Sequence, residues 1–243
     1  MPTRAEREPR DWVEWHRAYD DPNSRLSRRL RIVQAHLRRA LDERAGAVRI
    51  VSMCAGEGRD VISVLAGHSR RDDVRALLVE LDPRLAENAK TAARAAGLDG
   101  VEVRCADAAL TDSYAGAVPA DIVVACGVFG NISDADIQQT VDQLPGLCVP
   151  GATVIWTRGG TAEHDIAPDI CRWFEARGFE RIAFDSSPDE DHFRVGVHRL
   201  AGPTKPLQRG ERLFTFVRLP LAAAASEAAA SQETSDAVDG SGS

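Results

Sequence analysis

The sequence predicts a doubly wound α/β fold, with a seven-stranded, mostly parallel sheet that ends in an antiparallel hairpin and is preceded by N-terminal helices. Three observations predict this fold. Short runs rich in Val and Ile alternate with helical stretches, the last two runs follow each other without a helix between them, and an amphipathic helix comes before the first run. Buried strands that alternate with helices form βαβ units, which place helices on both faces of a parallel sheet.

The elements follow each other at regular intervals. The runs that we expect to form parallel strands span residues 48–54, 76–81, 101–105, 121–126 and 152–157. The helical stretches between and after them lie near residues 58–67, 83–96, 133–144 and 165–177. Runs 179–184 and 193–200 are joined by a polar, turn-like segment, which predicts the hairpin.

The two ends of the chain differ from this central part. Residues 24–44 have the spacing of an amphipathic helix, whose arginines we expect on its solvated face. We therefore divide the chain into a helical lid or appendage at 1–44, an α/β domain at 45–221 and a disordered tail at 222–243. Run 211–219 is expected to add a strand or to pack across an edge of the sheet. The tail is predicted because it contains no aromatic residue.

Composition excludes several classes of function. The chain has 243 residues, with 30 Lys and Arg against 37 Asp and Glu, and this net charge of −7 does not favour nucleic-acid binding. No apolar stretch of about 18 residues predicts a transmembrane helix, and the first residues lack the apolar segment of a signal peptide. The five cysteines form no close pair, which argues against a zinc or dithiol site. We expect a cytoplasmic protein without a metal or membrane partner.

A glycine turn follows the first predicted strand. Gly56 and Gly58 lie where a buried strand ends and a helix begins, and glycine there permits positive φ and close approach of a ligand to the backbone. Glu80 closes the second strand, where a carboxylate can accept hydrogen bonds from both ribose hydroxyls of a nucleoside. The pairing of the turn with Glu80 predicts a nucleotide site.

Two nucleotide-binding patterns compete for this turn. A dinucleotide fingerprint requires a third glycine, but Val61 occupies that place. The segment instead resembles class I S-adenosylmethionine (SAM)-dependent methyltransferases, in which an acid precedes three alternating glycines, acids follow the second and third strands, and a hairpin ends the sheet. The corresponding places are Cys54-Ala-Gly56-Glu-Gly58, Glu80, Cys105-Ala-Asp107 and residues 179–200. In this chain Ser52 stands where the family has the acid, and Cys54 stands where the family has the first glycine.

The resemblance implies a SAM site along the carboxyl ends of the strands. Asp107 would face the adenine amino group, with Ala106 and Ala108 beside the ring, and the segment after the fourth strand would lie under the sulfonium. The other reading of Asp107 is a helix N-cap or turn residue. The residues expected to contact the cofactor are Tyr19, Cys54, Ala55, Gly56, Gly58, Glu80, Leu81, Asp107, Ala108, Cys126 and Gly127.

The implied activity is methyl transfer to a small molecule. The tetrapeptide of amino-methyltransferases is absent after the fourth strand, where Gly127-Val-Phe-Gly-Asn131 stands instead. Two alternatives stay open. One is an NAD(P)-dependent oxidoreductase, and the other is a non-catalytic relative that binds SAM as a regulator, which the changes at Ser52 and Cys54 leave open. A homodimer is compatible with either.

An aromatic cluster near the N-terminus predicts either a packing helix or a lid. Trp12, Trp15 and Tyr19, with the neighbouring His16, lie close to helical spacing. As a lid, this segment would bring Tyr19 and His16 to the methyl donor or acceptor, with His16 as the candidate catalytic residue. Other polar residues expected near the mouth of the site are Asn131, Arg158, Glu163 and His164.

Overall fold

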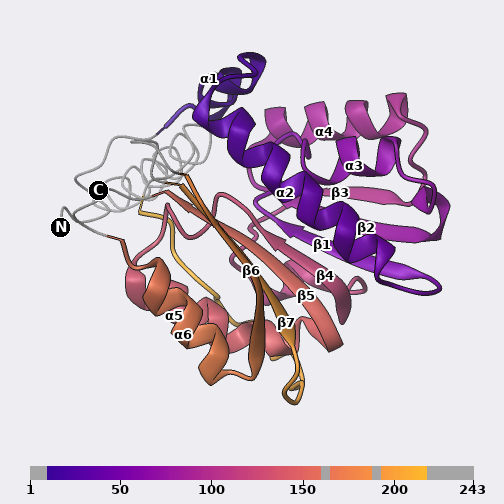
Figure 1. Ribbon diagram of the computed structural model, residues 1–243. Helices are drawn as coiled ribbons and strands as arrows, with labels where there is room; N and C mark the ends of the chain where they lie inside the picture. Colours follow the sequence, from indigo (N-terminus) through magenta and orange to yellow (C-terminus); the bar gives the residue numbers. More distant parts are fainter. Residues whose placement is uncertain (1–9, 160–164, 188–192, 218–243) are drawn as a thin grey trace, which may run out of the picture.

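The structure is a computed structural model that describes residues 10–159, 165–187 and 193–217 (Figure 1). Its strands are β1 (Val48–Met53), β2 (Val74–Glu80), β3 (Val101–Cys105), β4 (Ala120–Ala125), β5 (Cys148–Gly159), β6 (Phe179–Ser186) and β7 (Phe193–Leu200). Its α-helices are α1 (Trp12–His16), α2 (Arg25–Asp42), α3 (Val61–Ala66), α4 (Pro83–Ala95), α5 (Asp134–Gln143) and α6 (Ala167–Ala176). The tail predicted at 222–243, and Glu163 and His164, lie outside the described residues.

The strands form one seven-stranded sheet in the order β3-β2-β1-β4-β5-β7-β6. The first five strands are parallel to their neighbours, whereas β7 is antiparallel to both β5 and β6. This topology confirms the predicted fold class, including the C-terminal hairpin. The strand order reverses beside β1, and ligands of open α/β sheets bind at the carboxyl ends of the strands near such a point.

Helices cover both faces of the sheet, as Figure 1 shows, with α2, α3 and α4 on one face and α5 and α6 on the other. On the first face, Val33, Leu37 and Leu41 of α2 are buried against Ile50 of β1 and Ile122 of β4. The helix begins at the N-cap Ser24, whose side chain accepts from the N–H of Ser27. The predicted division at residue 44 stays a prediction, although α2 contributes to the core.

The opposite face contains an aromatic core. Trp156 of β5 and Phe174 of α6 are stacked, and both rings are fully buried. His198 of β7 stacks on Phe174 with 4.3 Å between ring centroids, and its Nδ1 accepts the indole N–H of Trp156 at 3.1 Å. Phe179 at the start of β6 is also buried and extends this core.

Residues 211–217 add no strand to the sheet. They form only two isolated bridges, Leu110 with Arg212 and Ile132 with Phe216. The segment therefore packs across the loops that follow β3 and β4, where the N–H of Leu213 donates to the carbonyl of Ala109 at 2.7 Å. Of the two expectations for this run, packing across an edge is the one that the structure favours.

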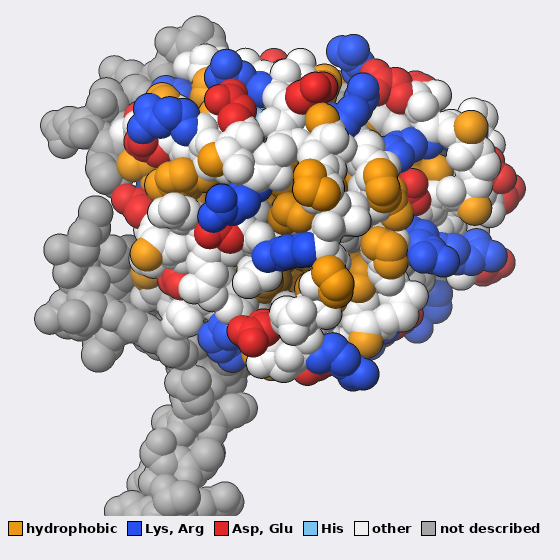
Figure 2. Space-filling view, turned by 90° about the horizontal axis from the view of Figure 1, so that it is seen from below, with side chains coloured by type: hydrophobic (Ala, Val, Ile, Leu, Met, Phe, Trp, Pro, Cys, Tyr) orange, Lys and Arg blue, Asp and Glu red, His pale blue; other side chains and the backbone are white. Residues whose placement is uncertain are grey.

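The surface carries charges of both signs. In Figure 2 basic and acidic side chains alternate over the exposed face, and apolar side chains lie between them. No helix within the described ranges is long and apolar enough to span a bilayer. In the same part of the chain, no group of three His, Cys, Asp or Glu side chains could hold a metal ion.

Candidate active site

One pocket lies at the carboxyl ends of β1 to β4, the position at which parallel sheets bind ligands. The N-terminal segment, α2, the glycine turn and Phe216 complete its walls. Every residue predicted as a cofactor contact or as the catalyst lines it except Gly58, and Ala106, expected beside the adenine ring, is also outside the lining. Those that line it are His16, Tyr19, Cys54, Ala55, Gly56, Glu80, Leu81, Asp107, Ala108, Cys126 and Gly127.

The glycine turn has an unusual backbone at three positions. Cys54, Gly56 and Gly58 have φ values of +53°, +58° and +70°. A Cβ added at Gly58 would lie 2.6 Å from Cδ1 of Ile62 and 2.7 Å from Cδ2 of Leu78. Gly58 therefore lets α3 pack closely on β2 and does not face the pocket. Cys54 adopts the left-handed conformation in spite of its side chain, a conformation that favours glycine.

Glu80 connects the end of β2 to the glycine turn. Its side chain is 8% exposed, and its two oxygens accept the backbone N–H of Gly56 at 2.7 Å and of Asp82 at 2.8 Å. Burial raises the pKa of this carboxyl, although these N–H groups oppose the shift. Each carboxylate oxygen has a second lone pair for a further donor. The backbone thus holds the group in one orientation at the pocket wall.

Asp107 occupies the loop after β3, where it acts as a turn residue and also lines the pocket. One oxygen accepts the N–H of Ala109 at 2.9 Å, as a turn residue does, and the other pairs with Arg212 at 3.0 Å. The carboxylate also lines the pocket, next to the buried Ala108. Sequence reasoning missed Arg212, because no pattern in run 211–219 indicates that it returns to this loop.

His16 lies directly over the glycine turn. Its Nδ1 donates to the carbonyl oxygen of Trp12 at 2.6 Å, and its Nε2 points at Gly56, where an added Cβ would lie 2.5 Å away. Burial lowers the pKa of the imidazole. With Nδ1 used as a donor, the neutral ring presents the lone pair of Nε2 toward the turn.

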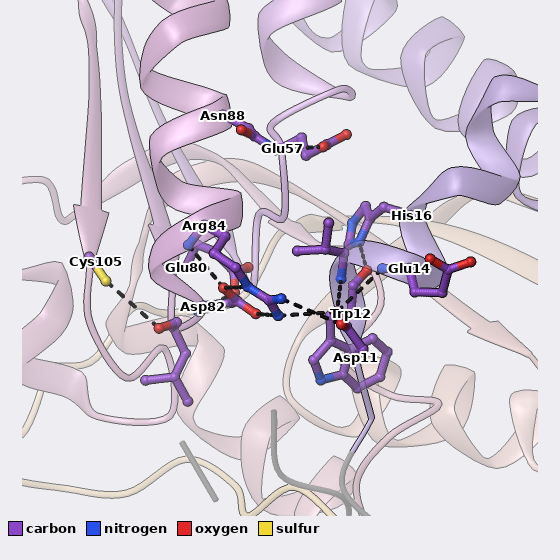
Figure 3. Close-up of polar contacts among 12 residues, drawn as sticks. Asp11, Trp12, Glu14, His16, Glu57, Glu80, Asp82, Arg84, Asn88 and Cys105 are labelled. Atoms are coloured by element: carbon purple, nitrogen blue, oxygen red, sulfur yellow. Dashed lines mark hydrogen bonds and ion pairs between the residues drawn. The ribbon is translucent and has the colours of Figure 1, made fainter. Parts of the chain in front are cut away.

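The segment that carries His16 is attached to α4 by an ion pair. Figure 3 shows Arg84, near the start of α4, extending to Asp11, the N-cap of α1. The guanidinium lies 3.1 Å from Asp11 and 2.8 Å from the fully buried Asp82. Arg84 lowers the pKa of Asp11, largely through their hydrogen bond. The aromatic rings of Trp12, Trp15 and Tyr19 pack edge to face beside this contact.

Four charged residues that line the pocket were not predicted, and two of them are buried; the four are Arg29, Glu57, Arg59 and Asp60. Arg29 of α2 is 8% exposed and hydrogen-bonds the hydroxyl of Tyr19, so the expectation that every arginine of this helix is solvated is wrong. Asp60, the N-cap of α3, is 7% exposed, and burial raises its pKa to about 6. A signal for Arg29 exists, because it precedes Val33 by four residues and Leu37 by eight and so shares their helix face.

The other polar candidates differ in position. Asn131 lines the pocket, and its side-chain amide donates to the carbonyl of Gly127 at 2.6 Å. Arg158 is buried outside the pocket lining and donates to the carbonyl of Phe129 at 2.5 Å, which indicates a structural role. The thiols of Cys54 and Cys126 have pKa values raised by burial, so both are protonated near neutral pH.

Comparisons with known proteins place this arrangement in a fold family. No family model and no curated protein matches the chain. Magnesium protoporphyrin IX methyltransferase of Synechocystis PCC 6803, with bound SAM, matches with a TM-score of 0.61 and 14% identity, over 77% of this chain and 90% of that one. The CurJ carbon methyltransferase matches with 0.61 and 14%, over 79% and 59%.

A third match has a cofactor product bound. The 1,6-didemethyltoxoflavin-N1-methyltransferase of Burkholderia thailandensis, with bound S-adenosylhomocysteine, has a TM-score of 0.59 and 14% identity, over 79% of this chain and 84% of that one. Identities this low establish the fold alone. The chain has the fold of the class I SAM-dependent methyltransferases, the family that its sequence resembles.

Proposed function

We propose that this chain binds SAM in the pocket at the strand ends and transfers the methyl group to a small-molecule acceptor. The observation that carries the proposal is the meeting of the glycine turn, Glu80, Asp107 and His16 in one pocket. These groups come from four separate segments, and the fold brings them to the place where the sequence pattern requires a nucleoside.

The residues present fit a nucleoside. Glu80 is held by two backbone N–H groups and keeps a lone pair on each oxygen for the ribose hydroxyls. Leu81 and Ala108 offer apolar surface to an adenine ring, and Asp107 offers a carboxylate to its amino group. The bound cofactor would supply a methyl group already activated by a sulfonium, so the chain needs only to align the acceptor and exclude water.

His16 is our candidate for proton removal from the acceptor. The burial that lowers its pKa keeps the imidazole neutral near pH 7, and Nε2 holds the available lone pair. Trp12, Trp15 and Tyr19 around it would shield the site from water. We expect His16→Ala to lower turnover more than SAM affinity, and Tyr19→Phe to affect SAM affinity at least as much as turnover.

Several observations support a small acceptor over the alternatives. Two of the structural neighbours are named for small molecules, a magnesium protoporphyrin and a didemethyltoxoflavin. Two features argue against an NAD(P)-dependent oxidoreductase. Val61 occupies the place of the third glycine, and β6 and β7 form an antiparallel hairpin. A cytoplasmic location, the absence of nucleic-acid partners and a homodimer stay predictions.

Native mass spectrometry of freshly purified protein, followed by calorimetry with SAM and with NADH, tests the proposal. We expect a bound mass of SAM or S-adenosylhomocysteine, and heat of binding for SAM alone. Binding of the nicotinamide nucleotide without SAM would contradict the proposal. A non-catalytic relative would bind SAM yet release no S-adenosylhomocysteine with any member of an acceptor library that includes phenols, amines, thiols and carbon acids.

A further inference from the structure

The pocket has two ends with different charges. The Glu80 end is formed by Cys54, Glu80 and Asp107. There the charges of the two carboxylates add to burial in raising the pKa of the Cys54 thiol. The Arg29 end is formed by Tyr19, Arg29 and Asp60. There, besides the effect of burial, the charge of Arg29 lowers, and the charge of Asp60 raises, the pKa of the Tyr19 hydroxyl and of the Cys126 thiol. At the Glu80 end the carboxylate of Asp107 already pairs with Arg212, whereas Arg29 and Asp60 at the other end form no ion pair with each other.

The place from which related sequences supply an acid is neutral in this chain. Ser52, at the corresponding position in β1, is 1% exposed, and its hydroxyl has no hydrogen-bond partner among the described residues. A buried serine cannot balance the charge of an ammonium group. If the cofactor is bound here, a carboxylate elsewhere in the pocket is the group that can balance this charge.

Arg29 is a buried cation that forms no ion pair with any residue that the structure describes. Its side chain hydrogen-bonds the hydroxyl of Tyr19. A guanidinium removed from water is stabilised by a carboxylate that accepts two of its N–H groups. Because Arg29 faces the pocket, a ligand carboxylate is the group that suits this position.

Asp60 is the complementary buried anion. One oxygen accepts the N–H of Val61 at 2.8 Å, and no described Lys, Arg or His forms an ion pair with the carboxylate. Arg29 is close enough for its charge to lower the pKa of Asp60 against the effect of burial, but the two side chains form no ion pair with each other. Two opposite charges that share a pocket wall and do not pair match a zwitterion.

We propose that Arg29 and Asp60 bind the α-carboxylate and the α-ammonium group of the amino-acid end of SAM, and so replace the acid that is absent at Ser52. This inference rests on the proposed function. Asp60 follows the glycine turn directly and begins α3, so it lies on the same wall as the proposed nucleoside site. Arg29 reaches the pocket from α2.

Three ligands separate the two ends in calorimetry. S-adenosylhomocysteine carries both charged groups, S-adenosyl-3-thiopropylamine lacks the carboxylate, and 5′-methylthioadenosine lacks both. We expect the wild-type chain to bind S-adenosylhomocysteine at least tenfold more tightly than methylthioadenosine, because each charged hydrogen bond is worth about a factor of ten or more.

Single variants then assign each charge. Arg29→Met should weaken S-adenosylhomocysteine binding about tenfold or more and leave the other two ligands unchanged. Asp60→Asn should weaken both ligands that carry the ammonium and leave methylthioadenosine unchanged. Arg38→Met, which removes an exposed arginine from the same helix, is the matched control and should change none of the three affinities. A thermal melt of each variant reports whether it folds.

The outcomes distinguish this inference from the function on which it rests. If the wild-type chain binds none of the three ligands, the proposed function fails. If it binds methylthioadenosine as tightly as S-adenosylhomocysteine, the function stands and the inference is wrong, whether or not the variants fold. Variants that weaken all three ligands equally would also overturn it, since they would show a structural effect on the whole pocket.

Discussion

The Glu80 end and the Arg29 end of the pocket are built in different ways. At the Glu80 end the carboxylate is held by backbone N–H groups of the glycine turn and of the β2–α4 connection. At the Arg29 end the charges come from α2 and from the start of α3, and Tyr19, which Arg29 contacts, comes from the 3₁₀ helix Arg17–Asp20 that follows α1. One end is thus positioned by strand connections, and the other by the packing of helices.

This difference has a consequence for rigidity. Strand ends cannot move independently of the sheet, whose central strands are buried on both faces. In contrast, α1 has five residues, none of them buried, and is attached to α4 by the exposed pair Asp11 and Arg84. We therefore expect substitutions at the Glu80 end to act on both folding and binding, and those near α1 to act on binding alone.

The largest effect is expected for Glu80→Ala. Its removal leaves two buried backbone N–H groups without an acceptor, and each costs about 1–3 kcal/mol of folding free energy. The ribose contact is lost as well, so SAM affinity should fall well over tenfold. Denaturant unfolding and calorimetry measure the two losses, with Glu102→Ala on the exposed side of β3 as control. Unchanged SAM binding would show that the nucleoside lies elsewhere.

The two glycines of the turn separate stability from binding. Gly58→Ala forces a methyl group against Ile62 and Leu78, so we expect a loss of about 2–4 kcal/mol from overlap and positive φ together. Gly56→Ala has similar backbone strain, but its methyl group meets the imidazole of His16. It should cost less stability and displace His16, with weaker SAM binding. Equal unfolding free energies and equal affinities for the two variants would contradict this distinction.

The difference between strand ends and packed helices also explains which pocket residues the sequence predicts. Strand ends follow from the alternation of short apolar runs and helices, and the parallel topology then brings Glu80, Asp107 and Cys126 to one edge. Their pocket positions were therefore predictable without any contact information. Gly58 was the exception, because a positive-φ glycine at a turn serves close helix packing as readily as ligand approach.

The Arg29 end was missed because it depends on tertiary packing. An arginine among many on an amphipathic helix is normally solvated, and only its register with Val33 and Leu37 indicates otherwise. Asp60 has the ordinary appearance of an N-cap, and its burial depends on α2 covering it. Arg212 comes from a segment without regular secondary structure, so its pairing with Asp107 has no sequence signal.

The pH dependence of binding tests the Arg29 end in the unmodified chain. Burial raises the pKa of Asp60 to about 6, so its carboxylate is ionised above that pH and neutral below it. Only the ionised form attracts an ammonium group. The affinity for S-adenosylhomocysteine relative to methylthioadenosine should therefore fall about tenfold from pH 7 to pH 5.

Taking the ratio of the two ligands removes the titration of Glu80, because its proposed ribose contact is common to both ligands, and Asp60→Asn measures any contribution from His16. In Asp60→Asn the ratio should not depend on pH. A ratio in the wild-type chain that is constant over this range would mean that Asp60 does not contact the ammonium group.

The smallest effect is expected at the attachment of α1. Asp11→Asn keeps an N-cap for the N–H groups of Val13 and Glu14 and removes the charge that pairs with Arg84. Exposed ion pairs contribute little, so SAM affinity should change by less than about fivefold. The difference between variant and wild type should disappear in about 1 M salt, where such pairs are screened. Because Arg84 lowers the pKa of Asp11, the wild-type contact should persist through neutral pH and weaken only in acid. A large loss of binding in Asp11→Asn that persists in high salt would show that α1 is a fixed wall of the pocket, and the contrast between a rigid end and a movable end would then be wrong.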